Sequence, residues 1–125
     1  MAITDALAEA GVVAIHAEDL LATRASWLRD LPRTHYARVS VSGGDESNFH
    51  SELLINASPA GMRPSDPLPI PRKMLQPGRL VAKIAMTPKR TPLLIAAEAA
   101  GCNIHNGAPM LLTQMDRMVA FFAGR

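Results

Sequence analysis

A short apolar run that ends abruptly in a loop constrains the fold of this chain more than any other stretch. Residues 53–55 are Leu-Leu-Ile, which is typical of a strand buried on both faces of a sheet. The loop at residues 56–61 stops the strand, because Pro59 has no backbone donor and Gly61 tolerates a positive φ. In an open parallel sheet, ligands bind beyond such strand ends. An ordinary exit from a strand is the alternative interpretation.

Helical and strand patterns alternate along the rest of the chain. We expect helices at residues 2–10, 20–31, 92–100 and 107–122, and strands at residues 12–16, 38–41, 53–55, 80–86 and 103–105. This alternation predicts an α/β fold with a mostly parallel sheet and flanking helices. The strands at residues 53–55 and 80–86 should be neighbours that run in the same direction.

Local signals set the expected ends of these elements. Pro32 is expected to end the second helix. Thr91 precedes a proline and is a good N-cap for the third helix, which Gly101 should stop. We expect the other connections to be a turn at residues 42–45, a short helical segment at 46–51, and a proline-dense surface loop at 63–77 with a turn at 72–75. A disordered linker is the alternative for the last of these.

Composition indicates one globular domain without a nucleic-acid surface. The 125 residues are 48% hydrophobic and 19% charged, which favours a packed core over disorder. The net charge is only +2, and one Trp, one Tyr and three Phe accompany the scattered basic residues. Nucleic-acid binding typically uses a basic stripe with stacking aromatic side chains. We therefore expect no nucleic-acid partner.

Cysteine content and the first residues bear on the compartment. Cys102 is the only cysteine, so no intramolecular disulfide or cysteine-based metal cluster can form, and the four histidines lack metal-ligand spacing. Residues 1–7 lack the basic start and long apolar core of a signal peptide. No apolar run is long enough to span a bilayer. We expect a cytoplasmic protein with no metal and no membrane partner.

Three segments, in the same order and at similar spacing, resemble the shikimate dehydrogenase family. Asn-Ala-Ser-Pro-Ala-Gly-Met at residues 56–62 resembles the family's Asn-Ala-Thr-Pro-x-Gly-Met segment. Thr-Pro-Leu-Leu at 91–94 resembles its helix start, and Gly-Ala-Pro-Met-Leu-Leu-Thr-Gln at 107–114 resembles its Gly-Leu-Gly-Met-Leu-x-x-Gln segment. The resemblance implies the C-terminal NAD(P)-binding domain, with Rossmann topology, of an oxidoreductase of aromatic amino acid biosynthesis. Such an enzyme reduces 3-dehydroshikimate or oxidises shikimate or quinate.

The resemblance also implies which residues bind. The expected cofactor contacts follow the strands and are Asn56, Ser58, Met62, Gly107 and Met110, the last two at the nicotinamide end. Gln114 would reach the hydroxyl groups of the substrate, and it shares a helix face with Met110 four residues earlier. Three kinds of residue have an ordinary alternative: a methionine can fill the core, Gln114 can face solvent, and Gly107 can be only a turn glycine.

Acidic residues after the first expected strand bear on the choice between NAD and NADP. A carboxylate at this place accepts hydrogen bonds from the ribose hydroxyls of NAD, whereas an arginine favours the 2′-phosphate of NADP. Glu18 and Asp19 follow the strand at residues 12–16, and the family's NADP-type Asn-Arg-Thr is not visible. We therefore expect NAD over NADP, with Glu18 or Asp19 reading the ribose. In the alternative interpretation, Asp19 only caps the following helix.

Parts of the family pattern have no counterpart in residues 1–125. The first Rossmann strand, its glycine-rich loop, and the substrate domain with the catalytic lysine and aspartate are not found. We expect a partial NAD(P)-binding Rossmann domain that has no catalytic residue and is inactive alone. Lys83 and Met86 stand where many members have Asp and Tyr, so the substrate stays open.

A missing first strand has a structural consequence. In the strand order 3-2-1-4-5-6 the first strand is central, so its absence separates the first two expected strands from the other three. Either the two groups of strands close up, or two apolar edges lie open, and open edges would favour pairing between copies of the chain or aggregation. The alternative function is a non-catalytic binding or assembly module that a partner subunit completes.

Overall fold

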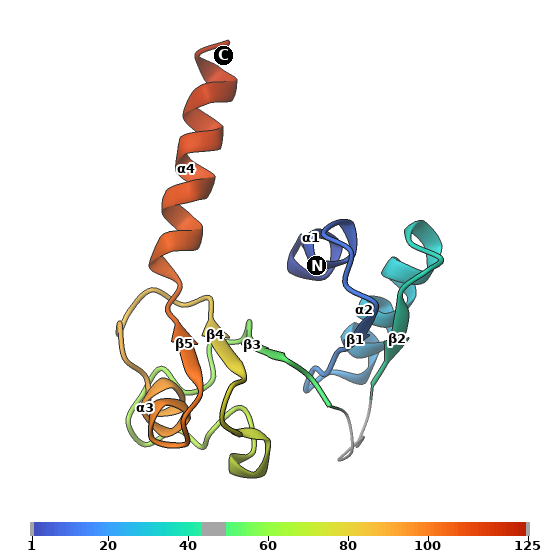
Figure 1. Cartoon of the computed structure of the whole chain (residues 1–125). Coiled ribbons are helices and arrows are strands. Elements are labelled where there is room, and N and C mark those ends of the chain that lie inside the picture. The colour runs from blue at the N-terminus through green and yellow to red at the C-terminus, as the bar shows by residue number, and fades with distance from the viewer. Residues whose placement is uncertain (1, 44–49, 125) are drawn as a thin grey trace. The chain divides into compact units, whose positions relative to one another are not determined.

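The computed structural model describes residues 2–43 and 50–124, which fall into two compact units (Figure 1). The first unit is Met1–His50 and the second is Ser51–Arg125. The described strands form two sheets, one in each unit. This grouping confirms the prediction that the first two strands separate from the other three. Residues 44–49, which include parts of the expected turn at 42–45 and helical segment at 46–51, lie outside the described residues.

The first unit pairs two short parallel strands and carries two helices. Its elements are α1 (Ala2–Glu9), β1 (Ala14–His16), α2 (Ala22–His35) and β2 (Ser40–Ser42). The register places Ile15 of β1 opposite Val41 of β2. Both side chains are buried, and they form a small core with Ala8 and Val39. Burial of these apolar side chains stabilises the unit.

The expectation that Pro32 ends the second helix was wrong, because α2 continues to His35. A proline in a helix interior removes one backbone hydrogen bond and usually kinks or ends the helix. Its own φ is nevertheless helical, so tertiary packing can override the local signal. Helix α2 packs against both α1 and β2, which provides such packing.

The second unit contains a three-stranded parallel sheet in the order β3-β4-β5 (Figure 1). Its elements are β3 (Leu53–Asn56), the 3₁₀ turn η1 (Arg72–Met74), β4 (Leu80–Lys83), α3 (Pro92–Ala99), β5 (Asn103–His105) and α4 (Ala108–Phe122). Ile55 pairs with Ala82, so the expected neighbours β3 and β4 do run in the same direction. Together the two units confirm the predicted α/β fold with parallel strands and flanking helices.

The core of the second unit lies between the sheet and α3. Val81, Leu93 and Ala97 are fully buried, and the cluster also includes Leu54 and Cys102. Thr91 caps α3 as predicted, since its Oγ1 accepts a hydrogen bond from the Leu94 N–H. The helix stops before Gly101, whose φ of +83° suits a glycine.

The expectation that residues 53–55 are buried on both faces was wrong. Only Leu54 is buried, while Leu53 and Ile55 are half-buried. Within the described residues β3 pairs with β4 alone, so it is the edge strand of its sheet. An edge strand has a neighbour on one side only, which leaves its side chains less covered.

The proline-dense segment after β3 is an ordered loop that contains the predicted turn, η1. The carboxylate oxygen Oδ2 of Asp66 accepts hydrogen bonds from the backbone N–H groups of Gly61 and Arg63, at 3.2 and 3.1 Å. The guanidinium of Arg79 donates to the carbonyl of Met74 at 2.9 Å. Among the described residues, no helix has the length and apolar character needed to cross a membrane.

Candidate functional site

Three strand ends meet at one edge of the second sheet. Because β3, β4 and β5 are parallel, the residues that follow Asn56, Lys83 and His105 leave the sheet at the same edge. In parallel sheets this carboxyl edge is where ligands bind. Five of the sequence-predicted site residues, Asn56, Ser58, Met62, Gly107 and Met110, lie at or just after strand ends of this sheet.

The loop after β3 is held by the side chains of Asn56 and Ser58. The Asn56 Oδ1 accepts from the backbone N–H and the hydroxyl of Ser58, at 3.1 and 2.7 Å, and its amide donates to the carbonyl of Ala60 at 2.9 Å. The Ser58 hydroxyl also accepts from the Ala60 N–H at 3.2 Å. These bonds give both side chains a role in shaping the loop. The loop leads to Met62, which is 39% exposed.

Gly107 brings the ends of β4 and β5 into direct contact. It is buried between β5 and α4, and an added Cβ would overlap the backbone carbonyl of Ile84. The same Cβ would lie 3.0 Å from the carbonyl oxygen of Ala85. Gly107 is therefore required by a close backbone approach at the carboxyl edge of the sheet.

Helix α4 starts at this edge and presents Met110 and Gln114. Met110 is 40% exposed and Gln114 is exposed, so neither is occupied in the core. The two residues lie four positions apart and share one helix face. Exposure leaves them free to contact a ligand, but their predicted roles stay predictions.

Lys83 is a charged residue that is buried in the described part of this unit. Its side chain is 2% exposed, and its ammonium group donates to the carbonyl of Pro88. Burial lowers the pKa of Lys83 below its ordinary value. By strand alternation Lys83 shares a sheet face with Val81, which packs in the core under α3. The hydrogen bond from the buried ammonium group of Lys83 therefore holds the segment at Pro88, which follows β4, against the core.

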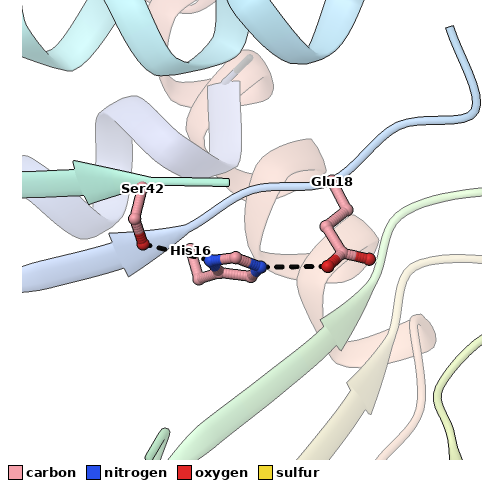
Figure 2. A network of polar contacts seen from close by, with 3 residues as sticks. All are labelled: His16, Glu18 and Ser42. Carbon is pink, nitrogen blue, oxygen red and sulfur yellow. Dashed lines mark hydrogen bonds and ion pairs between the residues drawn. The ribbon is translucent and has the colours of Figure 1, made fainter. Parts of the chain in front are cut away.

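A polar network lies at the strand ends of the first unit (Figure 2). His16, the last residue of β1, places its Nδ1 3.0 Å from the hydroxyl of Ser42 and its Nε2 3.0 Å from the Oε1 of Glu18. The side chain of His16 is 11% exposed, whereas that of Glu18 is 65% exposed. The network thus joins a nearly buried imidazole to a carboxylate that solvent or a ligand can reach.

Asp19 has a different contact from Glu18. Its Oδ1 accepts a hydrogen bond from the backbone N–H of Leu21 at 2.9 Å, just before α2 begins. This bond is an Asx turn ahead of the helix, because Leu21 precedes Ala22; it is not the N-cap bond that the alternative interpretation of Asp19 expects. Glu18 is therefore the better placed of the two carboxylates for a ligand.

Sequence reasoning missed three residues of this region, namely His16, Ser42 and Arg29. An added Cβ at Gly43 would lie 2.5 Å from the Nη1 of Arg29, so the guanidinium passes over the chain just after β2. His16 is one of four histidines without metal-ligand spacing, but its place at the end of an apolar strand, two positions before Glu18, is a usable signal. Arg29 comes from α2, and no local pattern links it to the strand ends.

Among the described residues, no group of three His, Cys, Asp or Glu side chains could hold a metal ion.

Comparisons with known proteins agree with this architecture. No family model matches the chain. A shikimate dehydrogenase (NADP(+)) from Afipia carboxidovorans is 32% identical over 127 residues, which cover 99% of this chain and 45% of the relative. Quinate dehydrogenase from Corynebacterium glutamicum, solved in complex with NAD, has a TM-score of 0.86 at 28% identity and matches 99% of this chain and 46% of its own. Ligand-free 5-ketofructose reductase of a Gluconobacter strain has a TM-score of 0.85 at 28% identity, with coverage of 99% and 47%. The chain spans less than half the length of the curated relatives it matches.

Proposed function

We propose that this chain, a homologue of the shikimate dehydrogenases over nearly its full length, is the dinucleotide-binding part of a shikimate/quinate dehydrogenase-like oxidoreductase. The observation that carries the proposal is that both sheets are parallel and have candidate binding residues after their strand ends. In the first unit an exposed carboxylate follows β1, and in the second unit an exposed methionine follows β3, while a tight glycine and a second exposed methionine follow β5. In doubly wound folds, dinucleotides bind outside the carboxyl ends of parallel strands, which is the place where these residues lie in each sheet. The rest of such an enzyme would supply the substrate domain and the catalytic lysine and aspartate.

The residues of the chain fit parts of a dinucleotide. The exposed carboxylate of Glu18 suits a ribose, because a carboxylate accepts hydrogen bonds that hydroxyl groups donate. Met62 and Met110 offer polarizable apolar surface for a nicotinamide ring. When bound, the nicotinamide would carry the hydride, and this chain would orient it. Residues 1–125 contain no Gly-x-Gly-x-x-Gly turn, the usual partner of the pyrophosphate.

For the cofactor we propose NAD rather than NADP, with Glu18 accepting from the ribose hydroxyls. A 2′-phosphate would bring negative charge next to this carboxylate. Asp19 is the weaker candidate because its carboxylate already accepts from the backbone. Arg29, which passes over Gly43, is the residue that could favour NADP instead.

At the nicotinamide end we propose contacts from the loop after β3 and from the start of α4. Ser58 and Met62 would lie along the cofactor, with Asn56 holding their loop in shape. Gly107 and Met110 would line the nicotinamide. Gln114 would bond to hydroxyl groups of a shikimate- or quinate-like carboxylate.

The proposal is tested with the purified 125-residue chain and NADH. We expect the fluorescence of NADH to change saturably as the chain is added, with a dissociation constant weaker than that of a complete enzyme. We expect no turnover of shikimate or quinate with NAD or NADP, because no residue of this chain matches the catalytic lysine and aspartate of the family. Absence of any saturable change with both NADH and NADPH would contradict the proposal, and turnover would contradict the expected inactivity.

A second candidate function is a non-catalytic assembly module. The observation that favours it is the apolar surface of α4, where Leu112, Met115 and Val119 are at least half exposed. The edge strand β3 adds a second surface on which another chain could pair. Light scattering after size-exclusion chromatography distinguishes this candidate, which requires a dimer or larger species. A concentration-independent monomer that binds NADH would favour the dehydrogenase-like role.

A further inference from the structure

The side chain of Glu18 would bind a ribose more tightly if its rotamer were already restricted before binding. Its side chain is 65% exposed and follows the end of β1, so by itself it would sample many rotamers. Fixing such a side chain on binding costs conformational entropy, and a side chain that is already held avoids much of this cost. Among the described residues, its carboxylate pairs with the imidazole of His16.

His16 is itself fixed on both sides (Figure 2). A carboxylate only accepts hydrogen bonds, so the Nε2 that faces Glu18 carries the proton. In the neutral ring the Nδ1 is then an acceptor, and the Ser42 hydroxyl can donate to it across 3.0 Å. Ser42 ends β2 directly opposite His16 in the parallel register. The imidazole therefore has a rigid support on the neighbouring strand.

We infer that His16 is a positioning residue that holds the Glu18 carboxylate toward the ribose of a dinucleotide; this inference rests on the proposed function. His16 does not contact the ligand in this role. Its Nε2–H occupies the Oε1 of Glu18 and leaves the other carboxylate oxygen for a ribose hydroxyl. Ser42 completes the support by fixing the ring.

The inference has a specific consequence for cofactor preference. A carboxylate held at the strand end accepts from the diol of NAD and repels the 2′-phosphate of NADP, whereas a freely rotating carboxylate can turn away from both. Loss of His16 should therefore weaken NAD binding more than NADP binding. A role confined to joining β1 and β2 would weaken both to the same extent.

The test is a double-substitution cycle on the full 125-residue chain, with dissociation constants for NAD and NADP from NMR-detected titrations. We expect His16→Phe to weaken NAD binding about 2- to 10-fold. Glu18→Gln should reduce the preference for NAD over NADP by roughly tenfold. In the Glu18→Gln background, His16→Phe should have an effect below about twofold, because the two residues act as one unit.

Two further variants and a stability measurement complete the experiment. His16→Gln, whose side-chain amide can still donate to Glu18, should restore part of the NAD affinity, and His50→Phe at an exposed histidine should change nothing. The free energy of unfolding of each variant shows whether the fold is kept. Equal losses for NAD and NADP, or equal effects of His16→Phe with and without Glu18, would overturn the inference while the proposed function stands. Failure of the unsubstituted chain to bind either dinucleotide would overturn both.

Discussion

The absence of a Cβ at Gly107 lets the chain after β5 approach the backbone that follows β4. An added methyl group would overlap the carbonyl of Ile84, which is backbone and cannot rotate away. We predict that Gly107→Ala lowers the free energy of unfolding by about 1–3 kcal/mol, the range for overpacked sites, as measured by urea denaturation.

Gly78→Ala is the matched control for this substitution. Its added Cβ would meet nothing within 4 Å, but its φ is +84°. The control should therefore show only the cost of a left-handed backbone, about 1–2 kcal/mol. It would also leave binding of NADH unchanged, whereas Gly107→Ala should weaken it. Intact NADH binding by Gly107→Ala would contradict the role given to this close approach.

Lys83 gives the chain a pH-dependent stability. Burial lowers the pKa of Lys83 below its ordinary value of 10.5, so the folded chain releases this proton at a lower pH than the unfolded chain. Between the two pKa values the unfolded state binds more protons, and the free energy of unfolding rises with pH. We predict that Lys83→Met removes this rise, as seen in urea denaturation from neutral pH up to pH 10.5.

The exposed Lys73 provides the control for the pH series. Lys73→Met should keep the rise, because its ammonium group stays in water in both states. Lys83→Met also leaves the carbonyl of Pro88 without its donor, at a cost of about 1 kcal/mol that does not depend on pH. Parallel pH profiles for the unsubstituted chain and Lys83→Met would show that the buried ammonium is not the cause.

Single residues of the site were only partly predictable from the sequence. Glu18 was identifiable because an acidic residue after a strand has a known chemical use. The contact between His16 and Ser42 was not predictable, since the two are 26 residues apart and meet only through parallel pairing. The burial of Lys83 was equally hidden, because a lysine at a strand end usually reaches solvent.

At the scale of elements, the cap of α3 offers a direct test. Thr91 Oγ1 accepts from the Leu94 N–H at 3.4 Å, and Thr91 itself is 4% exposed. We predict that Thr91→Ala lowers the free energy of unfolding by about 1 kcal/mol, since a first-turn N–H loses its acceptor. Thr91→Ser keeps the hydroxyl and should retain most of the stability. An equal loss in both variants would assign the effect to packing of the threonine methyl group.

Elements were predictable where local and tertiary signals agree. The helix start at Thr91 and its stop at Gly101 were correct because capping chemistry is local. The end of α2 was not, because packing against α1 and β2 carries the helix past Pro32. The strand at residues 80–86 was predicted too long: β4 ends at Lys83, where the chain turns away to meet Gly107.

At the scale of the whole molecule, the order of helices and strands along the sequence was enough to predict the strand pairing but not the burial of each strand. Alternating helices and strands predicted parallel pairing, and the family strand order predicted the separation into two groups of strands. The half-exposed edge strand β3 could not be predicted from its apolar sequence, because burial depends on how many neighbours a strand has. The predicted apolar face of α4 shows the same limit, since Leu111, Met115, Met118 and Phe122 have helical spacing and are nevertheless exposed.

The central claim, that a nicotinamide dinucleotide binds along the strand ends, is tested most directly by residue-resolved NMR. A ¹⁵N-labelled chain is titrated with NAD, and the backbone amide signals are followed. We predict saturable shifts at Glu18, at residues 57–62 and at Gly107 and Met110, with little change at the turn Arg72–Met74. Unchanged signals at saturating NAD, or shifts confined to residues away from these strand ends, would contradict the account.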